Sequence, residues 1–120
     1  MVHAYANRQL ISSEDVRGTL VYGINNEVVG QIEYFILEKA TGRIAYAVMR
    51  FGGFWQLVHN YYPIPWAALA YDDALEGYRT GITEAQLKSA PTLDDDSLVD
   101  RDWEARTHKH YGIPRYWMGG

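Results

Sequence analysis

The stretch from Val28 to Leu69 constrains the fold of this chain more than any other part of it. Residues 28–37 (VVGQIEYFIL) and 43–51 (RIAYAVMRF) are rich in β-branched and aromatic residues, which are typical of strands. The five residues between them end in Gly42, which can take the left-handed conformation of a hairpin turn. Both faces of each predicted strand are largely apolar, so we expect strands that are covered on both sides.

Four further short strands accompany this hairpin, at residues 19–22, 61–64, 70–71 and 78–81. Pro63 has no N–H to give to a neighbouring strand, so its strand is expected at an edge or a corner of the sheet. The last two strands flank a turn and form a second hairpin. About six short strands in successive hairpins predict a mainly β protein built as a small antiparallel β-barrel or sandwich.

Short helical elements are predicted on either side of these strands. Ser12 and Asp15 have the spacing of a capping box, which predicts one helical turn before the first strand. Thr83 and Gln86 have the same spacing and predict a helix over residues 83–90. We therefore expect short helical turns around the barrel.

Residues 93–120 form a C-terminal segment beyond the predicted barrel domain of residues 1–92. An acidic linker comes first, and Ser97 with Asp100 then predicts a helix from about Leu98 to Tyr111. One side of that helix carries Val99, Trp103, His110 and Tyr111. So thin an apolar stripe needs another surface to cover it.

Composition excludes several classes of function. The 120 residues contain no cysteine, which excludes disulfides, cysteine nucleophiles and cysteine-based metal sites. The net charge of −4 arises in residues 71–120, which hold ten acids and six bases, whereas residues 1–70 hold five of each. Without a dense basic patch, nucleic-acid binding is disfavoured. The sequence has no apolar run long enough for a transmembrane helix, and no signal peptide is apparent. We therefore predict a soluble, cytoplasmic protein without membrane insertion.

The chain carries no recognisable catalytic or metal-binding motif. His108 and His110 point about 200° apart on a helix and cannot share one ion. The run of residues 94–96 lacks the alternating acids of a calcium-binding loop and is interpreted as a solvated linker. No serine lies in Gly-x-Ser-x-Gly, and no phosphate-binding glycine motif occurs. We therefore predict no enzyme activity, no catalytic residue, no cofactor and no metal.

The many aromatic side chains are the remaining candidates for a functional surface, because aromatic anchors are typical of interface centres. The predicted interface consists of Phe54, Trp55, Leu57, Trp103, Tyr111, Tyr116 and Trp117. The aromatic residues of the C-terminal segment are expected to dock either on the barrel of the same chain or across a dimer. A small-ligand pocket walled by Trp55, Tyr61 and Trp66 is a further hypothesis.

Several features in order resemble the PRC-barrel domain, the module named after a cytoplasmic barrel of photosynthetic reaction centres. They are the turn Thr41-Gly42-Arg43, the segment Phe51-Gly52-Gly53, the Pro65-Trp66 corner, and the closing QLKSAP helix. The resemblance covers about residues 12–92, and the C-terminal segment is similar to an extension of stand-alone bacterial members.

The resemblance implies a small β-barrel that serves as an adaptor and has no shared catalytic residues. Similar barrels pack against membrane-protein partners in reaction centres and contribute to assembly in a ribosome-maturation factor. From the residues and the resemblance we expect a non-catalytic protein-interaction module that forms a homo-oligomer and binds an unidentified protein partner. The alternatives are an RNA- or ribosome-associated assembly factor and a small-ligand binding module.

Overall fold

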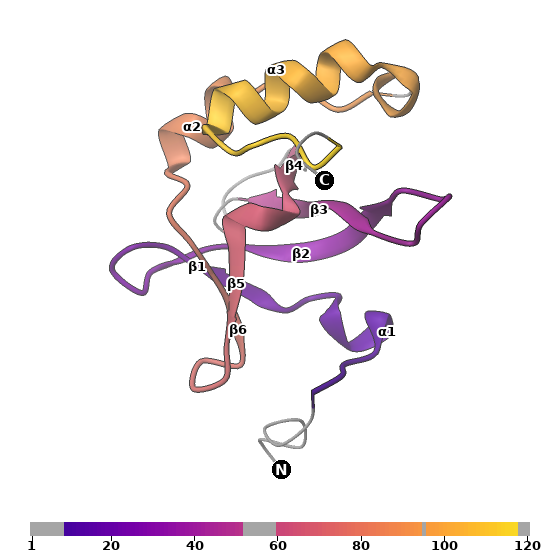
Figure 1. Ribbon diagram of the computed structural model, residues 1–120. Helices are drawn as coiled ribbons and strands as arrows, with labels where there is room; N and C mark the ends of the chain where they lie inside the picture. The colour runs from indigo at the N-terminus through magenta and orange to yellow at the C-terminus, as the bar shows by residue number, and fades with distance from the viewer. Residues whose placement is uncertain (1–8, 52–59, 95, 118–120) are drawn as a thin grey trace.

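The computed structural model of the protein describes residues 9–51, 60–94 and 96–117. The fold is mainly β, with six strands in one sheet and short helices around it (Figure 1). The elements in chain order are α1 (Ser13–Val16), β1 (Leu20–Tyr22), β2 (Val28–Leu37), β3 (Ile44–Phe51), β4 (Asn60–Pro65), the 3-10 helix η1 (Trp66–Ala68), β5 (Leu69–Asp72), β6 (Gly77–Thr80), α2 (Glu84–Ser89), the 3-10 helix η2 (Ser97–Val99) and α3 (Arg101–Tyr111).

The strands are ordered β4-β3-β2-β1-β6-β5 in the sheet. All neighbours are antiparallel except β1 and β6, which pair in parallel through Val21 with Tyr78 and Tyr22 with Arg79. The predicted all-antiparallel barrel is therefore wrong in two respects: the sheet is mixed, and among the described strands β4 and β5 remain unpaired ends. Hairpin signals in a sequence identify strands that follow one another, and they carry no information on a pairing as distant as β1 with β6.

Several strands, turns and helix caps have the positions that the sequence predicts. β2 has the predicted bounds, and Gly42 in the following hairpin has a left-handed φ of +80°. The strand with Pro63 lies at an end of the strand order, as predicted for a strand that lacks a donor. Thr83 and Gln86 form the predicted capping box at the start of α2.

Two other helix starts differ from the prediction. The Ser12 hydroxyl accepts from the N–H of Glu14 at 3.2 Å, so its cap does not involve Asp15 as a reciprocal partner. Asp100 itself caps α3, accepting from the N–H groups of Asp102 and Trp103. The predicted helix from residue 98 is thus divided into η2 and a later α3, because a capping residue takes non-helical dihedral angles.

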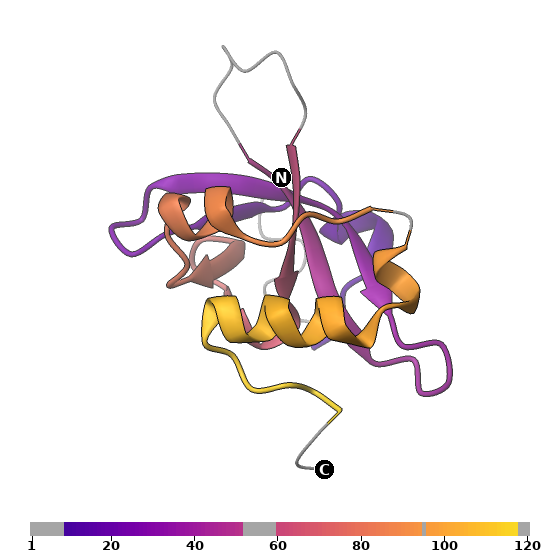
Figure 2. The same cartoon turned by 90° about the horizontal axis from the view of Figure 1, so that it is seen from above.

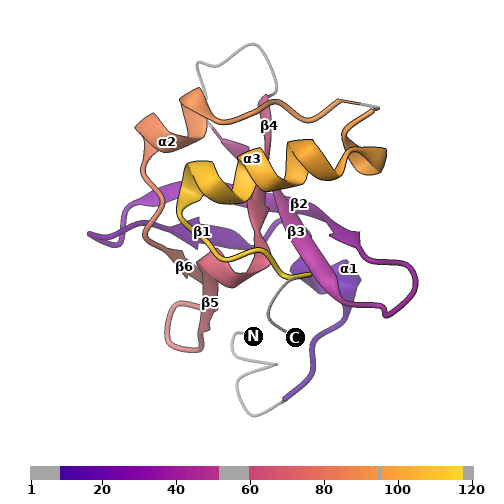
Figure 3. The same ribbon diagram turned by 45° about the horizontal axis from the view of Figure 1, so that its top comes forward.

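Strand β3 lies at the centre of the structure and is buried on both faces. Its residues 45–49 each expose at most 3% of their surface. One face contributes Ala47 and Met49 to the main core, which also includes Ile32, Leu87 and Tyr111. The other face packs against α3, which crosses that side of the sheet (Figures 2 and 3).

The covered side of α3 differs from the predicted stripe. Trp103 and Tyr111 are buried as expected, whereas Val99 belongs to η2 and is 88% exposed. Thr107 and His108 are the other buried residues of α3. The helix therefore packs on the sheet through a face of mixed polarity, and His108 belongs to the contact rather than to the surface.

Candidate functional site

A groove of about 660 Å³ lies between α1 and the C-terminal half of β2. Its apolar lining comes from α1, β2, β3, η1 and β6, and consists of Ile11, Val16, Ile32, Tyr34, Phe35, Leu37, Ile44, Trp66 and Tyr78. Three of these side chains also reach solvent at the rim: Ile11 is 37% exposed, Tyr34 50% and Leu37 55%. Exposed apolar side chains gathered around a hollow are typical of a docking surface.

Aromatic side chains fix the shape of this groove. The rings of Phe35 and Trp66 meet edge to face with centroids 5.2 Å apart, and those of Trp66 and Tyr78 with centroids 5.6 Å apart. Such packing holds Trp66 rigidly at the wall. Trp66 thus packs against the main core and also lines a surface hollow.

The polar residues of the groove are few. Its lining adds Ser13, Glu14, Arg17, Glu33 and Gly42 to the apolar set. The Glu33 carboxylate is held by Gln31 at 3.0 Å and lies 3.6 Å from the Arg50 guanidinium. The described residues of the lining include no histidine, lysine or cysteine, so this part of the groove suits the binding of an apolar segment rather than acid–base chemistry.

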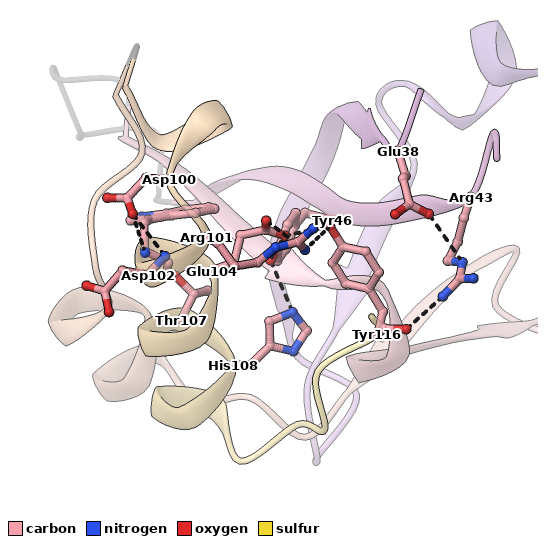
Figure 4. Close-up of polar contacts among 11 residues, drawn as sticks. Glu38, Arg43, Tyr46, Asp100, Arg101, Asp102, Glu104, Thr107, His108 and Tyr116 are labelled. Atoms are coloured by element: carbon pink, nitrogen blue, oxygen red, sulfur yellow. Dashed lines mark hydrogen bonds and ion pairs between the residues drawn. The ribbon is translucent and has the colours of Figure 1, made fainter. Parts of the chain in front are cut away.

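A second cluster fastens α3 to β3 (Figure 4). The hydroxyls of Tyr46 and Tyr116 donate to Oε1 of Glu104 at 2.7 and 2.6 Å. Nε2 of His108 lies 3.1 Å from the Tyr46 hydroxyl. The Arg101 guanidinium lies 3.1 Å from the other carboxylate oxygen of Glu104. Residues of β3, α3 and the following segment thus share one network.

The environment of this cluster changes the proton affinity of its members. Burial, followed by the hydrogen bond to Glu104, raises the pKa of Tyr46 far above its ordinary value. The same two causes raise the pKa of Tyr116 to about 12. Burial lowers the pKa of His108, and hydrogen bonds to the carbonyls of Ile113 and Pro114 act against that shift. Those carbonyls can only accept, so Nδ1 of His108 carries a hydrogen.

The segment after α3 is attached to the same cluster. Gly112 ends the helix with a left-handed φ of +70°, which turns the chain back towards β3. Arg43 then donates to the carbonyl of Tyr116 at 2.7 Å, and the Arg101 guanidinium lies 4.3 Å from the centre of the Trp117 ring. The cluster therefore holds structure together and lies away from the groove.

The predicted interface residues lie in different environments, and three of them are outside the described residues. Phe54, Trp55 and Leu57 lie outside the described residues. Trp103 and Tyr111 are buried within the chain, where Trp103 packs edge to face on Tyr46. Tyr116 and Trp117 are half-buried against the ring of His108. The aromatic residues of the C-terminal segment thus dock on their own sheet, the first of the two arrangements expected.

The predicted ligand pocket is only partly assembled in the described residues. Trp66 lines the groove, whereas Tyr61 is a 43% exposed residue of β4 and is not part of the lining. Trp55 lies outside the description. What forms around Trp66 is instead a groove shared with β2 and α1.

The chain was also compared with known proteins. The family model of the PRC-barrel domain matches residues 9–81. The chain belongs to the PRC-barrel family. A search of curated proteins finds no match. The PRC-barrel match contains the described residues that line the groove, and it ends before α2 and α3.

No group of three or more His, Cys, Asp or Glu side chains in the described ranges is placed to hold a metal ion. Nε2 of His110 lies 2.7 Å from the carbonyl of Gln86, away from the His108 contacts. No helix in the part of the chain that the structure describes has the length and apolar character needed to cross a membrane.

Sequence reasoning missed Ile11, Tyr34 and Leu37 as surface residues. The signal was present, since residues 28–37 are apolar on both faces. That pattern predicted a strand covered on both sides. In the described part of this PRC-barrel chain, Tyr34 and Leu37 in the C-terminal half of the strand are exposed, and both line the groove.

Proposed function

We propose that this chain is a non-catalytic protein-interaction module, and that it docks partners in the groove between α1 and β2. The observation that carries the proposal is the exposure of Tyr34 and Leu37 beside a hollow of about 660 Å³. When a partner covers the apolar side chains at the rim of a hollow, their surface is removed from water and the free energy of the system falls.

The charges around the groove support a protein partner over a nucleic acid. Among the lining residues that the structure describes, Glu14 and Glu33 are acidic and Arg17 is basic. Phosphate binding needs a surplus of basic groups, which this lining does not supply. The RNA-associated alternative therefore rests on the family resemblance alone.

A small apolar ligand is the second candidate occupant. The groove volume of about 660 Å³ falls within the range of small-molecule sites, about 300–1,000 Å³. Native mass spectrometry of the protein purified from its own cells tests this candidate. A bound non-protein mass that is lost in Leu37→Asp supports it, and the bare chain mass contradicts it.

Photo-crosslinking tests the protein-interaction proposal. A benzoylphenylalanine is placed at Leu37 or at Tyr34, one at a time, and the protein is irradiated in its native cells. We expect discrete crosslinked products whose mass identifies the partner. A product of twice the chain mass identifies a second copy of this chain, the homo-oligomer that the sequence analysis expects.

The matched control places the same probe at Ile24, which is 69% exposed and outside the groove lining. The proposal requires products at the groove positions that are absent at Ile24. Equal labelling at all three positions, or none at the groove, contradicts docking in the groove.

A further inference from the structure

The described sheet has three stretches of strand edge, and they differ in how well they could accept another strand. The edge of β4 contains Pro63 and Pro65, which have no N–H to donate. The edge of β5 is only four residues long and ends at Asp72. Prolines, short length and charge are the usual protections of a sheet edge.

The third stretch is the C-terminal half of β2, whose residues 33–37 contain no proline and one charged residue, Glu33. β1 pairs with β2 only as far as Gln31, and the last backbone bonds on that side join Ile32 to Gly18 and Thr19. Residues 33–37 have β3 on one side and, among the described residues, no strand on the other. This edge faces the groove, which Tyr34, Phe35 and Leu37 line.

A β-bulge and a helix explain why the edge stays open. The pairing of β2 with β3 shifts register between Ile32 and Tyr34, so that Glu33 is an extra residue. Such a bulge bends a strand and increases its twist. The chain ahead of β1 turns into α1 at this level, and α1 lies below the C-terminal end of β2 (Figure 1). The groove is the space between them.

We propose that an extended segment of a partner protein binds in this groove as an additional strand on residues 33–37 of β2. The proposal rests on the proposed function and names the form that its partner takes. Backbone hydrogen bonds to the open edge would supply affinity, and alternate side chains would enter the apolar lining. Five residues of edge correspond to a strand of about 17 Å.

The groove also specifies the chemistry of the segment. Among the described residues of the lining, Glu14 and Glu33 are acidic and Arg17 is basic, and the Arg50 guanidinium lies 3.6 Å from the Glu33 carboxylate. Charge complementarity favours a segment whose apolar residues alternate with small polar ones and whose ends carry Lys or Arg. α1 forms one wall of the groove. A single extended segment is narrow enough to lie between α1 and β2. The whole sheet of a second copy is wider and would clash with α1.

Three synthetic peptides test this inference on the full chain. The first is KVTVTVTK with both ends blocked, the second is the same peptide with alternate backbone nitrogens methylated, and the third is EVTVTVTE. Amide signals of the protein are followed by NMR, together with hydrogen exchange and contacts between peptide and protein. We expect the first peptide to slow the exchange of amides within residues 33–37 and to give cross-strand contacts with β2.

The other two peptides and two variants give the controls. Methylation should abolish the protection, because it removes the donors that a strand needs. The acidic peptide and the variant Glu14→Lys should each lose binding, whereas Asp96→Lys, an exposed site outside the groove, should keep it. Binding without loss in Glu14→Lys contradicts the assigned charge complementarity.

The outcomes separate this inference from the proposed function. Equal binding of the methylated and unmethylated peptides overturns strand addition and leaves docking in the groove intact. If the peptides make no contact with residues 33–37 but crosslinked products form at Leu37, strand addition is likewise overturned and docking in the groove is left intact. Failure of both the peptides and the crosslinking overturns both proposals.

Discussion

The hydroxyl of Tyr46 on β3 lies 2.7 Å from Oε1 of Glu104 on α3, a hydrogen bond between residues 58 positions apart. The single hydrogen of this hydroxyl goes to the carboxylate, and the ring of Tyr46 packs edge to face on those of Trp103 and His108. This contact joins the part of the chain that the family model matches to a helix beyond it.

We expect Tyr46→Phe to lower the free energy of unfolding by about 1–3 kcal/mol, because the Glu104 carboxylate loses a buried hydrogen-bond donor. Urea unfolding followed by circular dichroism measures the change. Tyr34→Phe is the matched control, since Tyr34 is half exposed at the groove rim. A loss in Tyr46→Phe no larger than in this control contradicts the role of the hydroxyl.

Tyr111→Phe should have the opposite sign. The Tyr111 hydroxyl is buried and has no hydrogen-bond partner in the described ranges. A buried hydroxyl without a partner carries a desolvation penalty of about 1–3 kcal/mol, so we expect its removal to raise the free energy of unfolding by about 1 kcal/mol. The same urea experiment measures it. Destabilisation comparable to that of Tyr46→Phe would reveal a partner for this hydroxyl.

The stability of the fold should fall as the pH falls through the ordinary range of histidine. Burial lowers the pKa of His108 below its ordinary value of 6.5, and its side chain is 2% exposed in the folded chain. The unfolded chain therefore takes up a proton that the folded chain resists. The contribution of His108 is fully present above pH 6.5 and is lost progressively below it.

Urea unfolding between about pH 8 and pH 5 tests this dependence. The control is His108→Asn, in which the acidic side chains are unchanged and the histidine contribution is absent. We expect the stability of the parent chain to decrease more steeply with acid than that of the variant. Parallel curves for the two proteins would refute the assigned shift.

Removal of the residues after Pro91 should destabilise the sheet, although the family model matches only residues 9–81. The truncation removes Tyr111 from the main core. It also removes Trp103, which packs on Tyr46, so that Tyr46 becomes exposed. Deleting one buried aromatic side chain costs about 3–5 kcal/mol, so we expect at least that loss.

Thermal unfolding and the binding of a hydrophobic dye measure the effect of this truncation, and light scattering measures the mass. We expect a lower midpoint, dye binding and association of the truncated chain. An unchanged midpoint in a dye-free truncated protein would show that the sheet is stable without α3.

Local chemistry made much of the fold predictable from the sequence. The turn at Gly42, the cap formed by Thr83 and the edge position of Pro63 each depend on a few neighbouring residues, and each is confirmed. The bounds of β2 followed from composition in the same way. The family was recognised from such features in order.

Long-range relations were not predictable on these grounds. The parallel pair of β1 and β6 depends on where a distant hairpin docks. The burial of His108 depends on contacts outside its helix, with the ring of Tyr46 on β3 and the carbonyls of Ile113 and Pro114. The groove arises because β1 begins only at Leu20, opposite Gln31, beside a bulge in β2. The hydrophobic periodicity of β2 does not show where its neighbouring strand begins.

The separation of Tyr46 from Glu104 also bears on the order in which the protein folds. The β2–β3 hairpin joins residues close in the chain, whereas the α3 contact closes a much longer loop between residues 58 positions apart. Closing a long loop costs more entropy before its contacts form. We infer that the hairpin forms early and that α3 docks late, so that variants in the α3 cluster accelerate unfolding while refolding keeps its rate.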